Sequence, residues 1–177
     1  MWTVWLALAL GLLALIIAWR ASARAAAAGG DASDAKLLAG SASQQARAAA
    51  AELEGLRRSI GVPPEGQKFL DLPAAEALQW MEANPGKGVV LDVRTPLEYE
   101  GGHVPGAQLI PVDQIERRYQ EVPRGAERLF VVCMGGTRSA VACEILADKG
   151  HQNLVNIEDG MGAWRGPVES GPAPTAL

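Results

Sequence analysis

Residues 129–139 read LFVVCMGGTRS, and this stretch decides the fold. A run of apolar residues that ends in a cysteine is typical of a buried strand finishing at Cys133. Gly135 and Gly136 permit backbone conformations that side chains forbid, so successive N–H groups can turn toward one point. A helix predicted over residues 138–149 directs the positive end of its dipole at the same point. The stretch therefore predicts a strand–loop–helix unit that binds an anion.

A cysteine thiol in such a loop is expected to have a lowered pKa and to be largely thiolate near neutral pH. The thiolate is the nucleophilic form of cysteine. The alternative is that Cys133 is a buried apolar residue at the end of a strand, as free cysteines often are. The glycine pair, arginine and serine that follow favour the reactive thiol.

The sequence on both sides of this unit predicts an α/β fold. Short apolar runs indicate further strands over residues 89–93, 108–110 and 153–156, and helical spacing indicates helices over residues 73–83 and 112–121. Strands that alternate with helices imply a largely parallel sheet. Such sheets bind ligands at the carboxyl ends of their strands, which is where Cys133 would lie.

Four motifs in this region resemble those of rhodanese-like, single-domain sulfurtransferases. Residues 133–139 resemble the active-site loop of the family, residues 90–99 (VLDVRTPLEY) its D-V-R-x-x-x-E-[FY] signature, and residues 102–107 (GHVPGA) its G-H-[IV]-P-G-A turn. Residues 155–164 (VNIEDGMGAW) are similar to its closing L-x-G-G-x-x-x-W motif, with Asp159 in place of a glycine. The resemblance implies an α/β rhodanese-like layer fold with a central, mainly parallel five-stranded sheet flanked by helices.

The resemblance also implies a persulfide shuttle, in which Cys133 takes sulfur from a donor and passes it to a nucleophilic acceptor. It places an anion-binding loop around the catalytic Cys133, and Arg138 either neutralises charge there or pairs with a carboxylate such as Glu98. The loop residues are Met134, Gly135, Gly136, Thr137 and Arg138, and the supporting residues are Asp92, Arg94, Glu98 and Ser139. Asp92 and Arg94 have an equally good interpretation as a structural salt bridge.

The donor is expected to be a small sulfur compound, thiosulfate or a persulfide, or a protein persulfide. Four residues separate Cys133 from Arg138, a shorter loop than in related cysteine phosphatases, so sulfur is favoured over phosphate. The alternative to an enzyme is a rhodanese-like binding module that holds a partner at a membrane with little turnover. No cofactor is expected, no metal-ligand spacing is found among the histidines and cysteines, and the net charge of −4 gives no reason to expect nucleic-acid binding.

The composition divides the chain of 177 residues into four segments. Residues 2–19 are apolar except for Thr3, and at about 1.5 Å a residue they span roughly the thickness of a bilayer core. Residues 21–51 hold 15 alanines. The predicted segments are a transmembrane anchor (2–19), an Ala-rich helical spacer (20–66), a rhodanese domain (67–166) and a disordered tail (167–177).

The charges beside residues 2–19 predict an orientation. Arg20, Arg24 and Lys36 all follow the apolar run, so the positive-inside rule places the domain in the cytoplasm of a bacterial-type cell, on a single-pass inner-membrane protein. The alternative is a periplasmic domain released after signal cleavage near Ala23. The spacer helix, which Gly61 and two prolines are expected to end, could also form a short coiled coil and a homodimer, but its alanines favour a solvated spacer.

Three further residues have predicted roles that are structural. His103 is expected to be a hydrogen-bonded turn residue and His151 an exposed one. Cys143 is expected to be a core residue of the helix after Cys133, with a redox role as the alternative.

Overall fold

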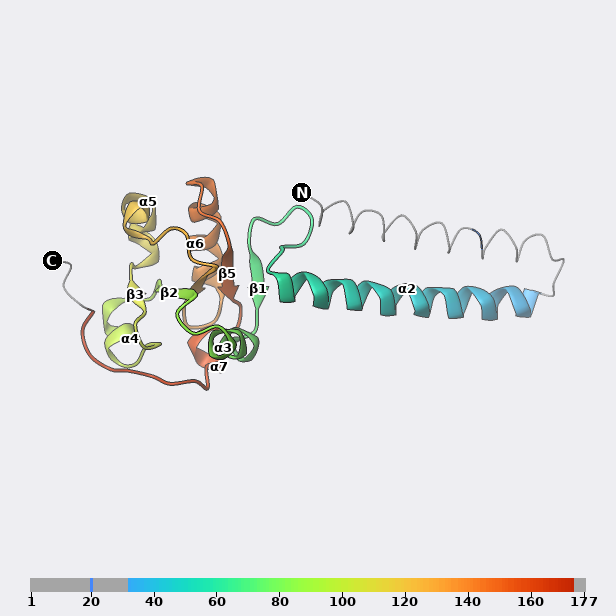
Figure 1. The fold of residues 1–177 in the computed structure, drawn as a ribbon, viewed down its shortest axis with the longest axis horizontal. Helices are drawn as coiled ribbons and strands as arrows, with labels where there is room; N and C mark the ends of the chain where they lie inside the picture. Colours follow the sequence, from blue (N-terminus) through green and yellow to red (C-terminus); the bar gives the residue numbers. More distant parts are fainter. Residues whose placement is uncertain (1–19, 21–31, 174–177) are drawn as a thin grey trace. The chain divides into compact units, whose positions relative to one another are not determined.

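The structure is a computed structural model that describes residue 20 and residues 32–173 (Figure 1). The chain divides into two compact units, Met1–Leu56 and Arg57–Leu177. The Ala-rich sequence forms the helix α2 (Ala32–Ile60), which ends as predicted where Gly61 adopts a φ of +74°. A single chain is described, so a homodimer through this helix stays a prediction.

The predicted anchor, residues 2–19, lies outside the described residues. Among the residues that are described, none of the helices combines the length and the apolar character that a bilayer span requires.

The second unit is built on a five-stranded sheet in which every neighbouring pair is parallel, with the order β1-β5-β4-β2-β3. This confirms the predicted parallel five-stranded sheet. The strand that precedes Cys133 is the central one, and all five of its residues are buried. The strands are β1 (Leu70–Leu72), β2 (Gly88–Asp92), β3 (Gln108–Leu109), β4 (Arg128–Val132) and β5 (Leu154–Ile157).

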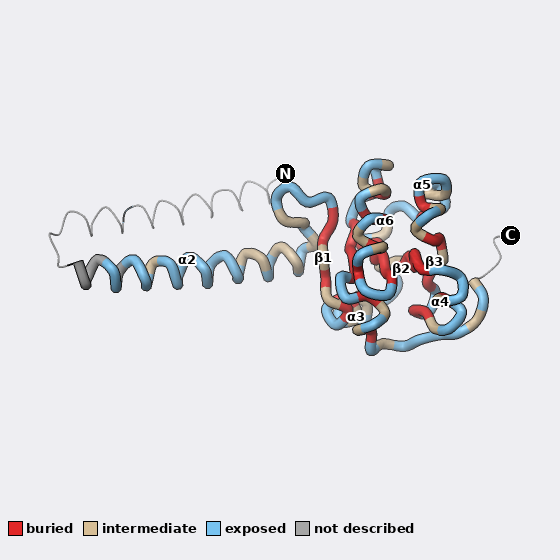
Figure 2. Tube along the Cα trace, turned by 180° about the vertical axis from the view of Figure 1, so that it is seen from behind, coloured by how far each residue is buried: buried red, intermediate tan, exposed pale blue. Residues whose placement is uncertain are grey.

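Helices cover both faces of the sheet and bury one apolar cluster each (Figures 1 and 2). One face packs against α6 (Thr137–Asp148) and α5 (Ile115–Arg118). The other packs against α3 (Ala74–Ala83), α4 (Pro96–Glu100) and α7 (Gly160–Ala163). Figure 2 shows the strands as the buried centre of this unit.

The prediction of a single helix over residues 112–121 is wrong. The segment forms three short helical elements instead. They are the 3-10 turn η1 (Val112–Gln114), α5, and a second 3-10 turn, η2 (Tyr119–Glu121). The backbone at Arg118 departs from helical geometry, with a φ near −112° and a ψ near 9°. Val122 is buried directly afterwards, so packing against the sheet overrides the helical pattern.

The predicted disorder of the tail is wrong for residues 167–173. Glu169 forms an antiparallel bridge with His103, and their N–H groups and carbonyl oxygens exchange two hydrogen bonds of 2.8 Å. The Gly171 N–H donates to the Glu100 carbonyl oxygen at 3.0 Å. Backbone pairing therefore holds this segment on the domain despite its prolines, and residues 174–177 lie outside the described part.

The buried guanidinium of Arg128, at the start of β4, holds the last turn of α2. Its Nη2 donates to the carbonyl oxygens of Arg58 (2.9 Å) and Ser59 (3.0 Å), and the guanidinium lies 4.8 Å from the Trp80 ring centre. A cation at the carboxyl end of a helix satisfies carbonyls that have no partner inside the helix. Hydrogen bonds to Arg58 and Ser59 thus hold the end of α2 at the amino end of the central strand.

Candidate active site

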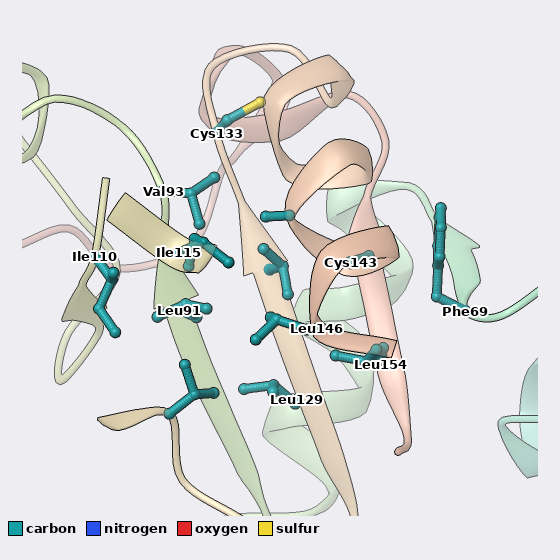
Figure 3. Close-up of a cluster of buried hydrophobic side chains, with 13 residues drawn as sticks. Phe69, Leu91, Val93, Ile110, Ile115, Leu129, Cys133, Cys143, Leu146 and Leu154 are labelled. Atoms are coloured by element: carbon teal, nitrogen blue, oxygen red, sulfur yellow. The ribbon is translucent and has the colours of Figure 1, made fainter. Parts of the chain in front are cut away.

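Cys133 lies where the central strand ends and is 2% exposed (Figure 3). In Figure 3 its sulfur lies beyond the apolar cluster and is directed toward the first turn of α6. The strand delivers the thiol to the carboxyl edge of the sheet, as the sequence predicted, and the core beneath it fixes its position.

The backbone of the following loop surrounds the sulfur with donors. The N–H groups of Gly135, Arg138 and Ser139 donate hydrogen bonds to the Cys133 sulfur. The sequence predicted N–H donors from residues 134–138; Gly135 and Arg138 belong to that set, and Ser139, in the first turn of α6, lies beyond it. These donors are fixed dipoles directed at the place where negative charge develops.

The pKa of the Cys133 thiol is lowered below its ordinary value by a balance of two effects. Burial disfavours the thiolate and raises the pKa, while hydrogen bonds from the Ser139 hydroxyl and from the loop N–H groups stabilise the thiolate. The hydrogen bonds outweigh the burial, and a lowered pKa is the direction expected of a reactive cysteine.

Ser139 has a hydroxyl with two acceptors. Its Oγ lies 3.3 Å from the Cys133 sulfur and 2.9 Å from the Gly136 carbonyl oxygen. Because the hydroxyl carries one proton, it donates to one of these acceptors at a time. It can therefore turn from the carbonyl to the sulfur when the sulfur becomes negative.

Arg138 is paired with Glu98, the partner that the sequence suggested. Its two Nη atoms donate to the Glu98 carboxylate at 2.9 and 2.7 Å. Hydrogen bonding to Arg138 holds the pKa of Glu98 well below its usual range and raises that of Arg138. Glu98 also accepts from the Thr95 N–H and hydroxyl in a capping box, so α4 braces the start of α6.

Two glycines let the turn after β5 approach the loop. Gly136 has a φ of +85°, and a Cβ built there would lie 1.8 Å from the Glu158 carbonyl oxygen. Gly160 has a φ of +60°, and its Cβ would lie 2.5 Å from the Cys133 carbonyl oxygen. The Met161 N–H also donates to that oxygen at 2.8 Å. Only glycine fits at both positions.

Asp159, which departs from the motif, has a structural contact of its own. Its Oδ1 accepts a hydrogen bond of 2.7 Å from the Ala74 N–H at the start of α3. The preceding proline gives that helix no side-chain cap, so Asp159 supplies one from a distant part of the chain.

Asp92 and Arg94 form a buried ion pair at the end of β2. Arg94 donates to both carboxylate oxygens of Asp92, at distances from 2.6 to 3.0 Å, and its Nη2 also donates to the Gly102 carbonyl oxygen at 2.7 Å. Asp92 lies beside Val132 in the sheet register. The pair ties the turn after α4 to the strand next to β4.

The remaining loop residues are open to solvent. Met134, Gly135 and Thr137 are exposed, so they form the layer between the buried Cys133 and solvent. Within the described part of the chain, no three His, Cys, Asp or Glu side chains are grouped in a way that could hold a metal ion.

The structure confirms two of the other sequence predictions and corrects one. His103 is buried, with its Nδ1 2.8 Å from the Tyr99 carbonyl oxygen, and Cys143 is a core residue whose pKa burial raises. His151 was expected to be exposed and is buried instead. Its Nε2 lies 3.1 Å from the carbonyl oxygen of Tyr119, the first residue of η2.

Comparison with protein families identifies this domain. A family model described as the rhodanese-like domain matches residues 73–166, more than half of the chain. The chain belongs to the rhodanese-like domain family. This rhodanese-like domain is 31% identical over 90 residues to a protein named sulfurtransferase from Allochromatium vinosum, a match that covers 51% of this chain and 83% of that protein.

Two relatives come from Bacillus subtilis (strain 168). YrkF, a proposed sulfur carrier protein, is 35% identical over 80 residues (45% of this chain), and the uncharacterized protein YqhL is 33% identical over 84 residues (48% of this chain). The chain spans 43% of the length of YrkF and 66% of YqhL.

A solved structure supports the same family. The crystal structure of a rhodanese-like domain protein from Staphylococcus aureus matches with a TM-score of 0.52 and 33% identity, covering 58% of this chain and 98% of that chain. The similarity therefore extends over an entire rhodanese-like domain.

Proposed function

We propose that the protein is a sulfurtransferase that carries sulfane sulfur as a persulfide on Cys133. The observation that carries this proposal is a lowered-pKa thiol that receives three backbone N–H donors and faces a serine hydroxyl. The same donors can stabilise the terminal sulfur of a persulfide, which is an anion larger than the thiolate. Membership of the rhodanese-like family and a relative named sulfurtransferase support the assignment.

The reaction has two steps, each a displacement at sulfur. The Cys133 thiolate attacks the outer sulfur of the donor, a new S–S bond forms, and the donor leaves with the electron pair of the broken bond as sulfite (from thiosulfate) or a thiolate (from a persulfide). A nucleophilic acceptor then attacks the outer sulfur of Cys133–S–S⁻. Its attack releases the Cys133 thiolate, so neither step requires an external oxidant or reductant.

Loading of Cys133 is the direct test of this function. Incubation of the full chain with thiosulfate, or with a thiol persulfide, should add the mass of one sulfur atom to the peptide that contains Cys133. Subsequent cyanide should remove it as thiocyanate. Cys133→Ser and Cys133→Ala should lose both signals, whereas Cys143→Ala, the matched control, should keep them. Retention of full transfer by Cys133→Ala would overturn the mechanism, and failure of every donor would favour a binding module at a membrane.

We also propose that residues 2–19 anchor the protein in a bacterial-type inner membrane with the domain in the cytoplasm. The apolar sequence and the basic residues that follow it support this location. Protease added to intact spheroplasts should leave the domain uncut, and digestion should require lysis. Digestion in intact spheroplasts would reverse the orientation, and release of a shortened soluble domain would show signal cleavage.

A further inference from the structure

The loop around Cys133 has no positive side chain that is left without a counter-charge. Residues 133–139 contain one basic residue, Arg138, and both of its Nη atoms are bonded to the Glu98 carboxylate. That carboxylate keeps its negative charge at neutral pH, since Arg138 lowers its pKa. The loop therefore stabilises an anion through N–H groups, which carry partial charges, and not through a net cation.

The chain beside the loop adds negative charge. The Gly136 backbone packs against Glu158, and the exposed residues Glu158 and Asp159 follow β5 at the carboxyl edge of the sheet. Arg165, which follows α7, directs one Nη atom at the carbonyl oxygens of Gly162 and Trp164. The two carboxylates outnumber this one cation, so these residues add net negative charge, which opposes a second negative charge on an incoming donor.

Exposed apolar side chains occur on the elements that meet at this edge. Leu97 on α4 is 81% exposed, Met134 in the loop 45%, and Val141 on α6 51%. Leu97 precedes Glu98 on α4, and Val141 lies one helical turn after Arg138 on α6, the two helices that the ion pair joins. This surface suits a carrier without charge.

We infer that Glu98 and Met134 determine donor specificity, so that the site prefers a thiol persulfide on an uncharged carrier to thiosulfate. This inference rests on the proposed sulfur transfer at Cys133. Attack on thiosulfate brings a thiolate and a dianion together and expels sulfite, another dianion. Attack on a thiol persulfide, R–S–S⁻, gathers one negative charge fewer and expels the thiolate R–S⁻, while the outer sulfur becomes Cys133–S–S⁻.

Donor competition on the full chain tests the preference. Three donors are compared by the kcat/KM for loading Cys133: thiosulfate, glutathione persulfide with its acidic carrier, and the persulfide of N-acetylcysteine methyl ester, whose carrier is uncharged. The expected order is the uncharged carrier first, the acidic carrier second and thiosulfate last, with the extremes about tenfold or more apart at low salt. Equal or faster loading from thiosulfate would overturn the inference.

Two variants change the charge and have matched controls. Met134→Lys places a cation in the loop and should raise the ratio of thiosulfate to persulfide loading about tenfold, whereas Val62→Lys, at another exposed apolar residue, should leave it unchanged. Glu98→Gln releases Arg138 and should shift the ratio the same way even if both rates fall. Glu121→Gln, which breaks the exposed Arg118 pair, should not shift it.

The ratio of thiosulfate to persulfide loading distinguishes a failure of this inference from a failure of the proposed sulfur transfer. If Cys133 is loaded by every donor but the ratio in Met134→Lys equals that of Val62→Lys, the specificity assignment fails and sulfur transfer stands. If no donor loads Cys133 in the unmodified chain, sulfur transfer itself fails.

Discussion

The hydroxyl of Ser139, in the first turn of α6, lies 3.3 Å from the sulfur of Cys133, six residues earlier in the chain. The same hydroxyl is 2.9 Å from the Gly136 carbonyl oxygen, so its proton has a resting acceptor and a second acceptor in the thiolate. The thiol chemistry of the site therefore depends on a side chain of α6 as well as on the loop.

Replacing Ser139 with alanine should raise the pKa of Cys133, because one hydrogen bond to the thiolate is lost. Loading of Cys133 should slow at neutral pH and recover at higher pH, because a raised pKa lowers the thiolate fraction only below that pKa. The rate of alkylation by iodoacetamide against pH measures the pKa directly. Cys143 is buried with a raised pKa and should not react in the native state. If the alkylation rate of the variant rises with pH over the same range as that of the unmodified protein, the N–H donors alone set the pKa of Cys133.

Gly136→Ala should disrupt the loop, since the new Cβ would meet the Glu158 carbonyl oxygen and the residue would keep a φ of +85°. Loading of Cys133 should fall by at least about a hundredfold, because small displacements of catalytic groups cost that much. Gly86→Ala is the matched control, with a φ of +76° but open space around its Cβ. It should lose about 1 kcal/mol of stability and no activity. Equal loss in both variants would make backbone strain, and not the close approach, responsible.

Asp92→Asn should destabilise the domain by about 3–5 kcal/mol, since it leaves the buried Arg94 guanidinium without a counter-charge. Urea unfolding followed by tryptophan fluorescence measures the loss. Glu121→Gln breaks an exposed pair with Arg118 and should cost less than about 1 kcal/mol. Similar values for the two variants would contradict the structural importance of the buried pair.

His151 should make stability fall as the pH is lowered through about 6.5, the pKa of an unperturbed histidine. Burial and the nearby charge of Arg124 lower its pKa in the folded state. Below about 6.5 the unfolded chain therefore binds a proton that the folded chain does not, and unfolding is favoured. His151→Gln should reduce the slope of the free energy of unfolding against pH in this range. An unchanged slope would assign the pH dependence to other groups.

The sequence predicted the site better than its surroundings. Cys133 could be placed because an apolar run, a glycine pair and a helix follow one another within a short stretch. The pairing of Arg138 with Glu98 could be named as a candidate because both belong to recognisable motifs. In both cases the signal is local, or is carried by a motif.

The elements that were missed lack a local signal. The strand β1 has three residues with Asp71 in the middle, and α4 and α7 are too short to show a helical period. The burial of His151 depends on a carbonyl 32 residues earlier in the chain. Gly160 could have been found, because a glycine in a closing motif indicates a close backbone approach, but its neighbour in space, the Cys133 carbonyl, could not.

The two ends of β4 carry different functional groups. Arg128 at its start donates hydrogen bonds to the carbonyl oxygens of Arg58 and Ser59, and Cys133 follows its last residue. The contact with Arg58 and Ser59 thus lies at the end of the central strand remote from the sulfur, and parallel ladders to β2 and β5 flank that strand. Attachment of Arg58 and Ser59 at one end of β4 therefore does not compete with the proposed sulfur chemistry at the other end.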